Sequence, residues 1–317
     1  MQLYFAPLEG ITDAIFRRVH HDTFSGVSKY FLPFVSPSES LSYTIRQEAE
    51  ISPALNAGLP AIPQILAKKA DYFLGMAKVF ADNGYPEVNL NLGCPSGTAT
   101  GKGKGAGMLK NPDELCRFLD DIYAKAPLPI SIKTRIGFDS VDEWPRLREV
   151  FSVYPIHELI IHPRTRNEQY GGTAHRDLPL SFSAFPYVYN GDIFTVADYQ
   201  EISALFPGAS AVMIGRGAIA NPALFQEISG GTPLTLDLLA LFHDRLCAAY
   251  LKSWPQSAAI GRMHAIMRYM FMCFDAPERY RKEIGKTANL DAYSDAVSRL
   301  FHECPFKETP SFVPNRP

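Results

Sequence analysis

Eight short apolar segments recur between residues 3 and 214, and helix-like segments separate most of them. Several of the eight are continuous apolar runs, which are typical of strands buried on both faces of a parallel sheet. Eight β/α alternations predict an α/β fold of the (β/α)8 TIM-barrel type. An open doubly wound sheet is the alternative, but no GxGxxG motif follows the first segment. The expected strands are Leu3–Leu8, Val27–Phe34, Ala61–Leu66, Glu87–Leu92, Pro129–Arg135, His157–His162, Tyr187–Asn190 and Ala211–Ile214.

Helical periodicity predicts the segments that connect these strands. The connection through His175–Ala184 is weakly helical and is broken by proline. After the last strand, Asn221 is expected to cap a short helix with Pro222 at its first position. The expected connecting helices are Thr12–Phe24, Ser38–Glu50, Asp71–Asn83, Pro112–Ala124, Asp142–Tyr154 and Ala197–Phe206.

The strand-like segments stop at a linker, Ser229–Pro233. Beyond it we expect only amphipathic helices, at Leu236–Leu251, Gln256–Phe274 and Asp291–Phe301. The sequence therefore predicts a barrel domain over residues 1–230 and an all-helical domain over residues 234–317.

Charge and cysteine usage limit the class of protein. The net charge of the 317 residues is −2, but Arg245–Lys286 holds eight basic and only three acidic residues, which favours a local basic face. Five scattered cysteines without a CxxC pair indicate reduced thiols and no zinc site. We find no signal peptide and no apolar window long enough for a membrane span, so we expect a cytoplasmic protein.

The segment EVNLNLGCP places Cys94 just past the end of an expected strand. The loop that follows, GTATGKGKGAGML, is rich in glycine, so a thiol there can approach a ligand and donate a proton. Lys102 and Lys104 in the same loop suit an anionic partner. Residues two apart on a strand share a face, so Asn89 is expected one layer deeper than Asn91.

Polar residues also stand at or near the carboxyl ends of most other expected strands. In a TIM barrel these ends meet at the active-site face. Gly191 and Gly215 offer backbone N–H groups to a phosphate. Lys133 suits the N1/O2 edge of a flavin, and Gln64 suits its pyrimidine edge because an amide both donates and accepts.

Seven motifs occur in a fixed order from Ala6 to Pro222: APLEGITD, NLGCP, KGKGAGML, IKTRIGFD, IHPRTR, YNGDI and MIGRGAIANP. This ordered set resembles the dihydrouridine synthase family, FMN enzymes that reduce uridine in RNA. The resemblance covers the whole expected barrel.

The resemblance implies an enzyme that uses FMN, with NADPH or NADH as reductant, to convert uridine to dihydrouridine in RNA, most of all tRNA. Cys94 matches the general acid, and Asn91 matches a substrate-side residue. We expect Lys102, Arg135, Arg164 and Arg166 to contact the RNA as well. The expected FMN ligands are Pro7, Leu8, Glu9, Gln64, Lys133, His162, Asn190, Gly191, Asp192, Gly215 and Arg216.

Three other interpretations stay open at this point. The chain fits an FMN barrel oxidoreductase for a free pyrimidine or another small molecule, a synthase acting on ribosomal RNA, or an RNA-binding protein without catalysis. Retained Cys94, Lys133 and His162 argue against the last. We expect a monomer that contains no metal. The sequence alone does not decide the modified position or the choice between NADPH and NADH.

Overall fold

The computed structural model describes residues 1–38, 44–307 and 309. The chain divides into two compact units. The first comprises Met1–Pro7, Ser28–Gly191 and Ser203–Met213 and holds the strands. The second comprises Leu8–Val27, Asp192–Ile202 and Ile214–Pro317 and is built from helices.

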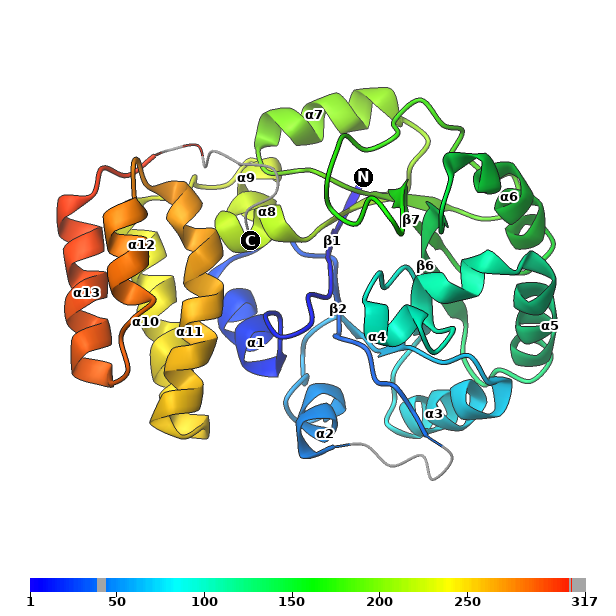
Figure 1. The fold of residues 1–317 in the computed structure, drawn as a ribbon, viewed down its shortest axis with the longest axis horizontal. Coiled ribbons are helices and arrows are strands. Elements are labelled where there is room, and N and C mark those ends of the chain that lie inside the picture. Colours follow the sequence, from blue (N-terminus) through cyan, green and yellow to red (C-terminus); the bar gives the residue numbers. More distant parts are fainter. Residues whose placement is uncertain (39–43, 308, 310–317) are drawn as a thin grey trace. The chain divides into compact units, whose positions relative to one another are not determined.

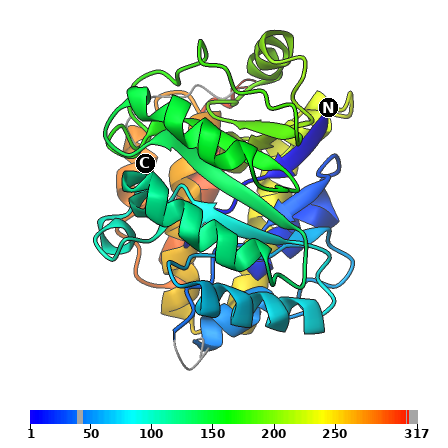
Figure 2. The same cartoon turned by 90° about the vertical axis from the view of Figure 1, so that its right-hand side faces the viewer.

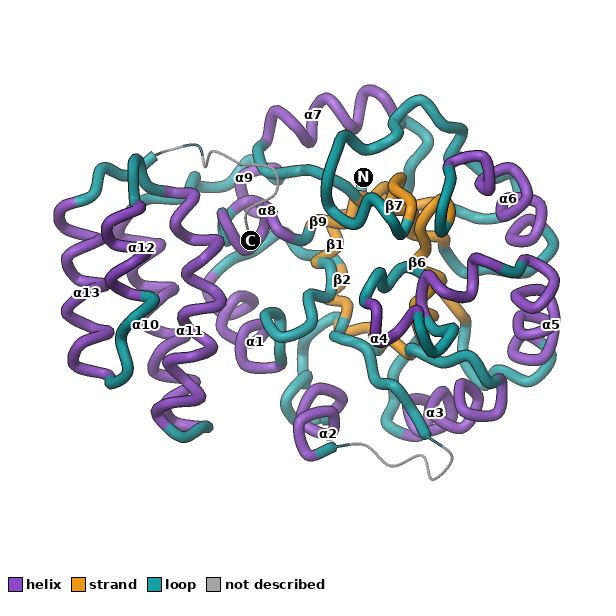
Figure 3. Tube along the Cα trace, viewed as in Figure 1, coloured by secondary structure: helices purple, strands orange, loops and turns teal. Residues whose placement is uncertain are grey.

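Nine parallel strands form a single, nearly closed barrel, shown in orange in Figure 3. Their order around the sheet is β3-β2-β1-β9-β8-β7-β6-β5-β4. The two edge strands, β3 and β4, are consecutive in the chain, and an isolated parallel bridge joins Ile65 of β4 to Val35, which follows β2. The strands are β1 Gln2–Phe5, β2 Lys29–Phe31, β3 Ala61–Ile62, β4 Gln64–Ile65, β5 Val88–Leu92, β6 Ile130–Gly137, β7 Leu159–Thr165, β8 Tyr187–Asn190 and β9 Ala211–Ile214.

The expected TIM barrel is confirmed, and all eight expected strands form. The third is divided into β3 and β4 at Pro63, which has no N–H to donate to a ladder. The sixth extends further than expected, to Thr165. Its register against β6 shifts between Arg135 and Gly137, so this end of β7 carries an irregularity.

Helices cover the outer face of the strands in the first unit, and Figure 2 shows α3, α5 and α6 there side by side. Their inward residues, such as Phe73, Phe118 and Phe151, are buried. The expected helix Ser38–Glu50 falls partly on residues 39–43, outside the described residues, and α2 begins at Ile45. The helices are α2 Ile45–Ile51, α3 Ala70–Asp82, α4 Gly97–Thr100, α5 Pro112–Tyr123 and α6 Trp144–Ser152, with short 3-10 turns η1 Gly105–Lys110 and η2 Val141–Glu143; α7, Val196–Leu205, has residues in both units.

In the second unit α1 packs against α10 (Figure 1). The rings of Phe16 and Phe242 meet edge to face at 5.7 Å. Asp13 caps α1 and accepts a hydrogen bond from the hydroxyl of Tyr250 at 2.8 Å, and Arg262 lies 3.3 Å from its second oxygen. The helices are α1 Ala14–Thr23, α8 Arg216–Ala220, α9 Leu224–Ile228, α10 Leu236–Ser253, α11 Gln256–Met270, α12 Glu278–Ile284 and α13 Leu290–Glu303, with the 3-10 turn η3 Phe271–Cys273.

Two expectations about helices are corrected. Asn221 ends α8 instead of starting a helix, and the next helix has Ala223 at its N-cap. The helix α12 was not expected, because seven residues rich in charge show little apolar periodicity. Within the described part of the chain, no helix is long and apolar enough to cross a membrane.

Candidate active site

The Cys94 loop begins where β5 ends, and Asn91 holds it. Asn91 Oδ1 accepts the backbone N–H groups of Gly93 at 3.0 Å and of Cys94 at 2.9 Å. The Asn91 side chain thus accepts from two backbone N–H groups that lie just past the end of β5. Cys94 itself is partly exposed. The loop therefore presents a thiol on a backbone that the strand end holds in place.

Gly105 has a left-handed backbone conformation, which lets the later part of the loop pack against Cys94. Gly105 has φ +58°, and a Cβ there would lie 2.9 Å from Cys94 Cβ and 3.0 Å from its carbonyl oxygen. The N–H of Ala106 donates to that same carbonyl at 3.1 Å. The glycine-rich loop is partly helical, since α4 and η1 form within it.

Beneath Asn91, three amide side chains are joined inside the barrel. Asn91 Nδ2 donates to Gln64 Oε1 at 2.7 Å, and Gln64 Nε2 donates to Asn89 Oδ1 at 2.8 Å. All three side chains are buried, so an unmade hydrogen bond would cost about 1–3 kcal/mol. The Gln64 amide thus carries a protein contact at each end, and its predicted contact with FMN would use its remaining lone pair or N–H.

Lys133 lies beside Asn91, because β5 and β6 pair these two residues in register. Burial lowers the pKa of Lys133 to about 7, and the nearby positive charge of Arg135 contributes to the same shift. No hydrogen bond or ion pair from another described residue reaches its ammonium group. Lys133 is half-buried, and a cation that is partly withdrawn from water without a partner is costly, so this position suits an anionic group from a ligand.

Three arginines brace the loops around Cys94 through backbone carbonyl groups. Arg135 is buried and donates to the carbonyl oxygens of Gly93 at 2.9 Å, Thr165 at 2.7 Å and Gln169 at 2.8 Å. Arg166 donates to the carbonyl of Pro95 at 3.1 Å, and Arg164 to those of Gly171 and Gly172 at 3.1 and 2.6 Å. These contacts position loops, and the predicted contact of these arginines with RNA stays a prediction.

His162 is buried, and its Nε2 lies 3.1 Å from Arg164 Nη1. An arginine can only donate, so Nε2 accepts and the ring hydrogen of the neutral imidazole is on Nδ1. A Cβ at Gly191 would lie 3.6 Å from the His162 ring and 3.3 Å from Tyr189 Oη, so the chain passes closely there. Asn190 Nδ2 donates to the carbonyl of Met213 at 2.7 Å and ties β8 to β9.

Other predicted FMN ligands lie in the second unit. Arg216, at the start of α8, pairs with Asp192 at 2.9 Å, and Asp192 has φ +41°. Gly215 precedes that helix as its N-cap residue. The N–H of Leu8 donates to Thr12 Oγ1 at 2.8 Å in a turn beside the exposed Glu9. Flavin binding by these residues and by Pro7 stays a prediction.

A group of lysines lies near the Cys94 loop. The pKa of Lys104 is lowered by burial and by the positive charges of Lys102 and Lys68. Lys104 donates to Ser36 Oγ at 2.7 Å, whereas Lys102 is exposed. The sequence gives no sign that Lys68 joins this group, because 34 residues separate it from Lys102.

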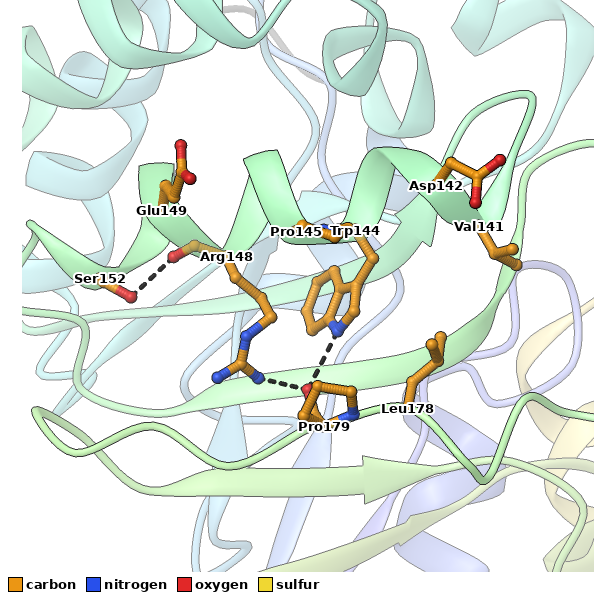
Figure 4. Close-up of a pocket in the computed structure, with 9 residues that line it drawn as sticks. All are labelled: Val141, Asp142, Trp144, Pro145, Arg148, Glu149, Ser152, Leu178 and Pro179. Atoms are coloured by element: carbon orange, nitrogen blue, oxygen red, sulfur yellow. Dashed lines mark hydrogen bonds between the residues drawn. The ribbon is translucent and has the colours of Figure 1, made fainter.

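A pocket of about 620 Å³ opens elsewhere in the first unit, along α6. Figure 4 shows Trp144 and Arg148 turned toward Pro179, and both donate to its carbonyl oxygen. None of the predicted catalytic or cofactor residues lines it, and the hydrogen bonds of Trp144 and Arg148 are made within the protein. The pocket is lined by Val141, Asp142, Trp144, Pro145, Arg148, Glu149, Ser152, Leu178 and Pro179.

Comparison with known proteins gives matches over most of the chain. The family model described as dihydrouridine synthase matches residues 4–293. The chain is 30% identical to a tRNA-dihydrouridine(16) synthase of Cupriavidus necator, over 85% of this chain and 93% of the relative. It is also 30% identical to a tRNA-dihydrouridine(16) synthase of Pseudomonas putida, over 83% and 86% respectively.

Solved structures with the same fold include distant barrels. An old yellow enzyme from Trypanosoma cruzi has a TM-score of 0.51 at 11% identity, over 80% of this chain and 94% of that one. A variant of NCR from Zymomonas mobilis has a TM-score of 0.51 at 16% identity, with the same coverage. At these identities the likeness concerns the fold.

Proposed function

Because this chain belongs to the dihydrouridine synthase family, a family of flavin-dependent oxidoreductases, we propose that it reduces uridine in tRNA to 5,6-dihydrouridine. The proposed cofactor is FMN, and the proposed reductant is NADPH or NADH. The observation that supports this most is the partly exposed Cys94, held by Asn91, in a site where Lys133 meets no anion among the described residues.

The residues at this site fit a flavin. Lys133 would hold the electron-rich N1/O2 edge of the ring system, because its own surroundings supply no compensating anion within the described part of the chain. Gln64, on β4 at the other side of β5, retains hydrogen-bonding capacity for a pyrimidine edge. When bound, the flavin supplies a hydride.

We assign Cys94 as the general acid. Hydride addition at C6 of uracil leaves negative charge on C5 and O4, and the Cys94 S–H delivers the proton to C5. Hydride and proton together saturate the C5–C6 double bond, and the thiolate then regains a proton from solvent. General acids of this kind contribute about 10²–10⁴-fold to a rate.

The target uridine has to leave its stack to reach a thiol at the mouth of a barrel, at a cost of roughly a few kcal/mol. Contacts with phosphates offset such costs. We propose that Lys102 and the exposed basic residues of the C-terminal helices supply these contacts. We further propose a cytoplasmic location, with which five free cysteines are compatible.

The position to test first is uridine 16. The relatives from Cupriavidus necator and Pseudomonas putida are named for this position, and their similarity extends over more than four fifths of this chain. The experiment is mass spectrometry of individual tRNAs from a strain that lacks this protein, followed by reaction of the purified enzyme with those tRNAs. Loss and restoration of dihydrouridine at position 16 support the proposal. Unchanged tRNA, together with turnover of a free pyrimidine, would favour the small-molecule oxidoreductase.

A further inference from the structure

The amide chain beneath Asn91 continues to a carboxylate deeper in the barrel. Asn89 Nδ2 donates to Ser131 Oγ at 2.9 Å, and Ser131 Oγ donates to Glu87 Oε1 at 2.8 Å. Asn89 and Ser131 have no exposed surface, and Glu87 is 4% exposed. Ser131, Asn89, Gln64 and Asn91 thus form a file of hydrogen-bonded side chains. This file joins Glu87 to the backbone N–H groups of Gly93 and Cys94.

The groups at the two ends of the file determine the direction in which hydrogen bonds are donated along it. An ionised carboxylate only accepts, so Ser131 has to donate to Glu87. Backbone N–H groups only donate, so Asn91 has to present its oxygen to Gly93 and Cys94. Each side chain between these ends then accepts on the loop side and donates on the Glu87 side, which is the arrangement observed.

A cation balances the charge of Glu87. Lys29 Nζ lies 2.6 Å from Glu87 Oε2 and 2.7 Å from Glu158 Oε1, and His157 Nε2 lies 3.6 Å from Glu87 Oε2. The Tyr4 hydroxyl lies 2.9 Å from the other oxygen of Glu158. Glu158 therefore shares the ion pair with Glu87, and its two oxygens are engaged by Lys29 and Tyr4.

We propose that Glu87 is a positioning residue for the Cys94 loop. Its carboxylate, acting through Ser131, Asn89 and Gln64, stabilises the orientation in which each amide accepts from the loop side, so that Asn91 presents an acceptor to the loop. The connection to catalysis rests on the proposed role of Cys94, whereas the connection to loop structure does not.

The substitution Glu87→Gln reverses the hydrogen bond between position 87 and Ser131, at the deep end of the file. The ammonium of Lys29 favours the amide oxygen, so the Gln NH2 faces Ser131. Ser131 then accepts from position 87, its hydroxyl hydrogen loses its acceptor, and that hydrogen competes with the NH2 of Asn89. In molecules in which Ser131 donates to Asn89, the amides turn over and Asn91 points its NH2 at the N–H groups of Gly93 and Cys94, so the cap on the loop is lost in that population.

A second carboxylate restores the direction from the middle of the file. In Glu87→Gln/Asn89→Asp, the new carboxylate accepts from both Ser131 and Gln64. Gln64 then keeps its oxygen toward Asn91, and Asn91 again accepts from the loop. The double variant has the same number of carboxylates as the parent. A return of slow exchange in it would match the restored net charge and would follow from the restored orientation of the amides between position 89 and the loop.

The test is backbone amide hydrogen exchange at Gly93 and Cys94 in the full-length protein, with dihydrouridine formation measured in parallel. Glu87→Gln should raise exchange at both amides by about tenfold or more, as expected when local opening replaces a formed hydrogen bond. The double variant should return exchange to within about twofold of the parent. Glu158→Gln, the matched control, weakens the same ion pair and should leave exchange at both amides unchanged.

Three outcomes would overturn the proposal: unchanged exchange in Glu87→Gln, the same increase in Glu158→Gln, or no rescue by Asn89→Asp. The proposed function has a separate readout, because the loss of activity in Cys94→Ala does not depend on Glu87. Exchange that follows the proposal while Cys94→Ala stays active would retain the positioning role and reject the general acid.

Discussion

Asn91 Oδ1 lies 2.9 Å from the backbone nitrogen of Cys94, so the last polar residue of β5 holds the residue to which we assign proton transfer. The same side chain donates to Gln64 and is therefore held from below. Hydrogen bonds of Asn91 therefore connect β4, the end of β5 and the backbone of Cys94. A change in any of them is expected to affect where the thiol lies.

Replacing Cys94 with Ala should leave FMN content and flavin reduction by NAD(P)H nearly unchanged, because the thiol acts only on the uracil ring. Dihydrouridine formation should fall about 100-fold or more. Flavin absorbance, anaerobic stopped-flow reduction and mass spectrometry of the RNA product measure the three quantities. Cys116→Ala, in α5 of the same unit, is the control and should retain activity. Full activity of Cys94→Ala would exclude the general-acid role.

Lys133 should make FMN affinity depend on pH. In the FMN-free protein its pKa is lowered to about 7, and a bound anion favours the protonated form and raises that pKa. Affinity should therefore be highest below pH 7 and fall by up to about tenfold per pH unit above it, until the pKa of the complex is reached. Lys133→Met should bind FMN more weakly, and its affinity should lack this pH slope. Fluorescence titration with FMN between about pH 6 and 9 tests this, and parallel slopes in both proteins would place the lysine away from the cofactor.

Gly105→Ala should disturb the Cys94 loop. The substitution places a methyl group 2.9 Å from Cys94 Cβ and also forces a left-handed residue to carry a Cβ. We expect about 1–3 kcal/mol of destabilisation and a loss of activity greater than that of a control with the backbone cost alone. Gly103→Ala is that control, because its φ is +68° and its new Cβ would meet only the Lys68 side chain, at 3.5 Å. Thermal unfolding and dihydrouridine formation compare the two, and equal activities would contradict the close packing.

The C-terminal helices should contribute to RNA affinity through charge. Arg279, Lys282 and Lys286 are exposed, and their replacement by Gln removes three potential phosphate partners. The log–log salt slope of tRNA binding should become shallower by roughly 0.7–0.9 for each phosphate that is no longer neutralised. The control changes Lys78, Arg117 and Arg146, exposed residues of the barrel helices, to Gln with the same change in net charge. Equal slopes in the two triple variants would argue against the helical region as the RNA platform.

Substitution is a sharper test here than truncation. Phe16 and Tyr250 show that α1, early in the chain, packs with α10 in one compact unit. A chain that ends at Ser229–Pro233 would expose the apolar face of α1, and a loss of binding could then reflect unfolding.

Local patterns predicted the barrel well. The bounds of β8 and β9 match the expected strands, because continuous apolar runs between turn residues identify strands buried on both faces. The division at Pro63 shortened the third strand, since a proline interrupts a ladder but not an apolar pattern. The short helix α12 lacked such a pattern and was missed.

The order of motifs and the spacing of polar residues also identified the family, the cysteine loop and the layer of Asn89 beneath Asn91. The partners of these residues came only from the folded chain. Arg166 reaches Pro95, Lys29 reaches Glu87 and Glu158, and Glu87 reaches Ser131, each across more than 40 residues of sequence. Periodicity reports which face a residue occupies, because faces follow from local backbone geometry. Which donor meets which acceptor on that face depends on how distant strands are brought into register, and that is decided by tertiary packing.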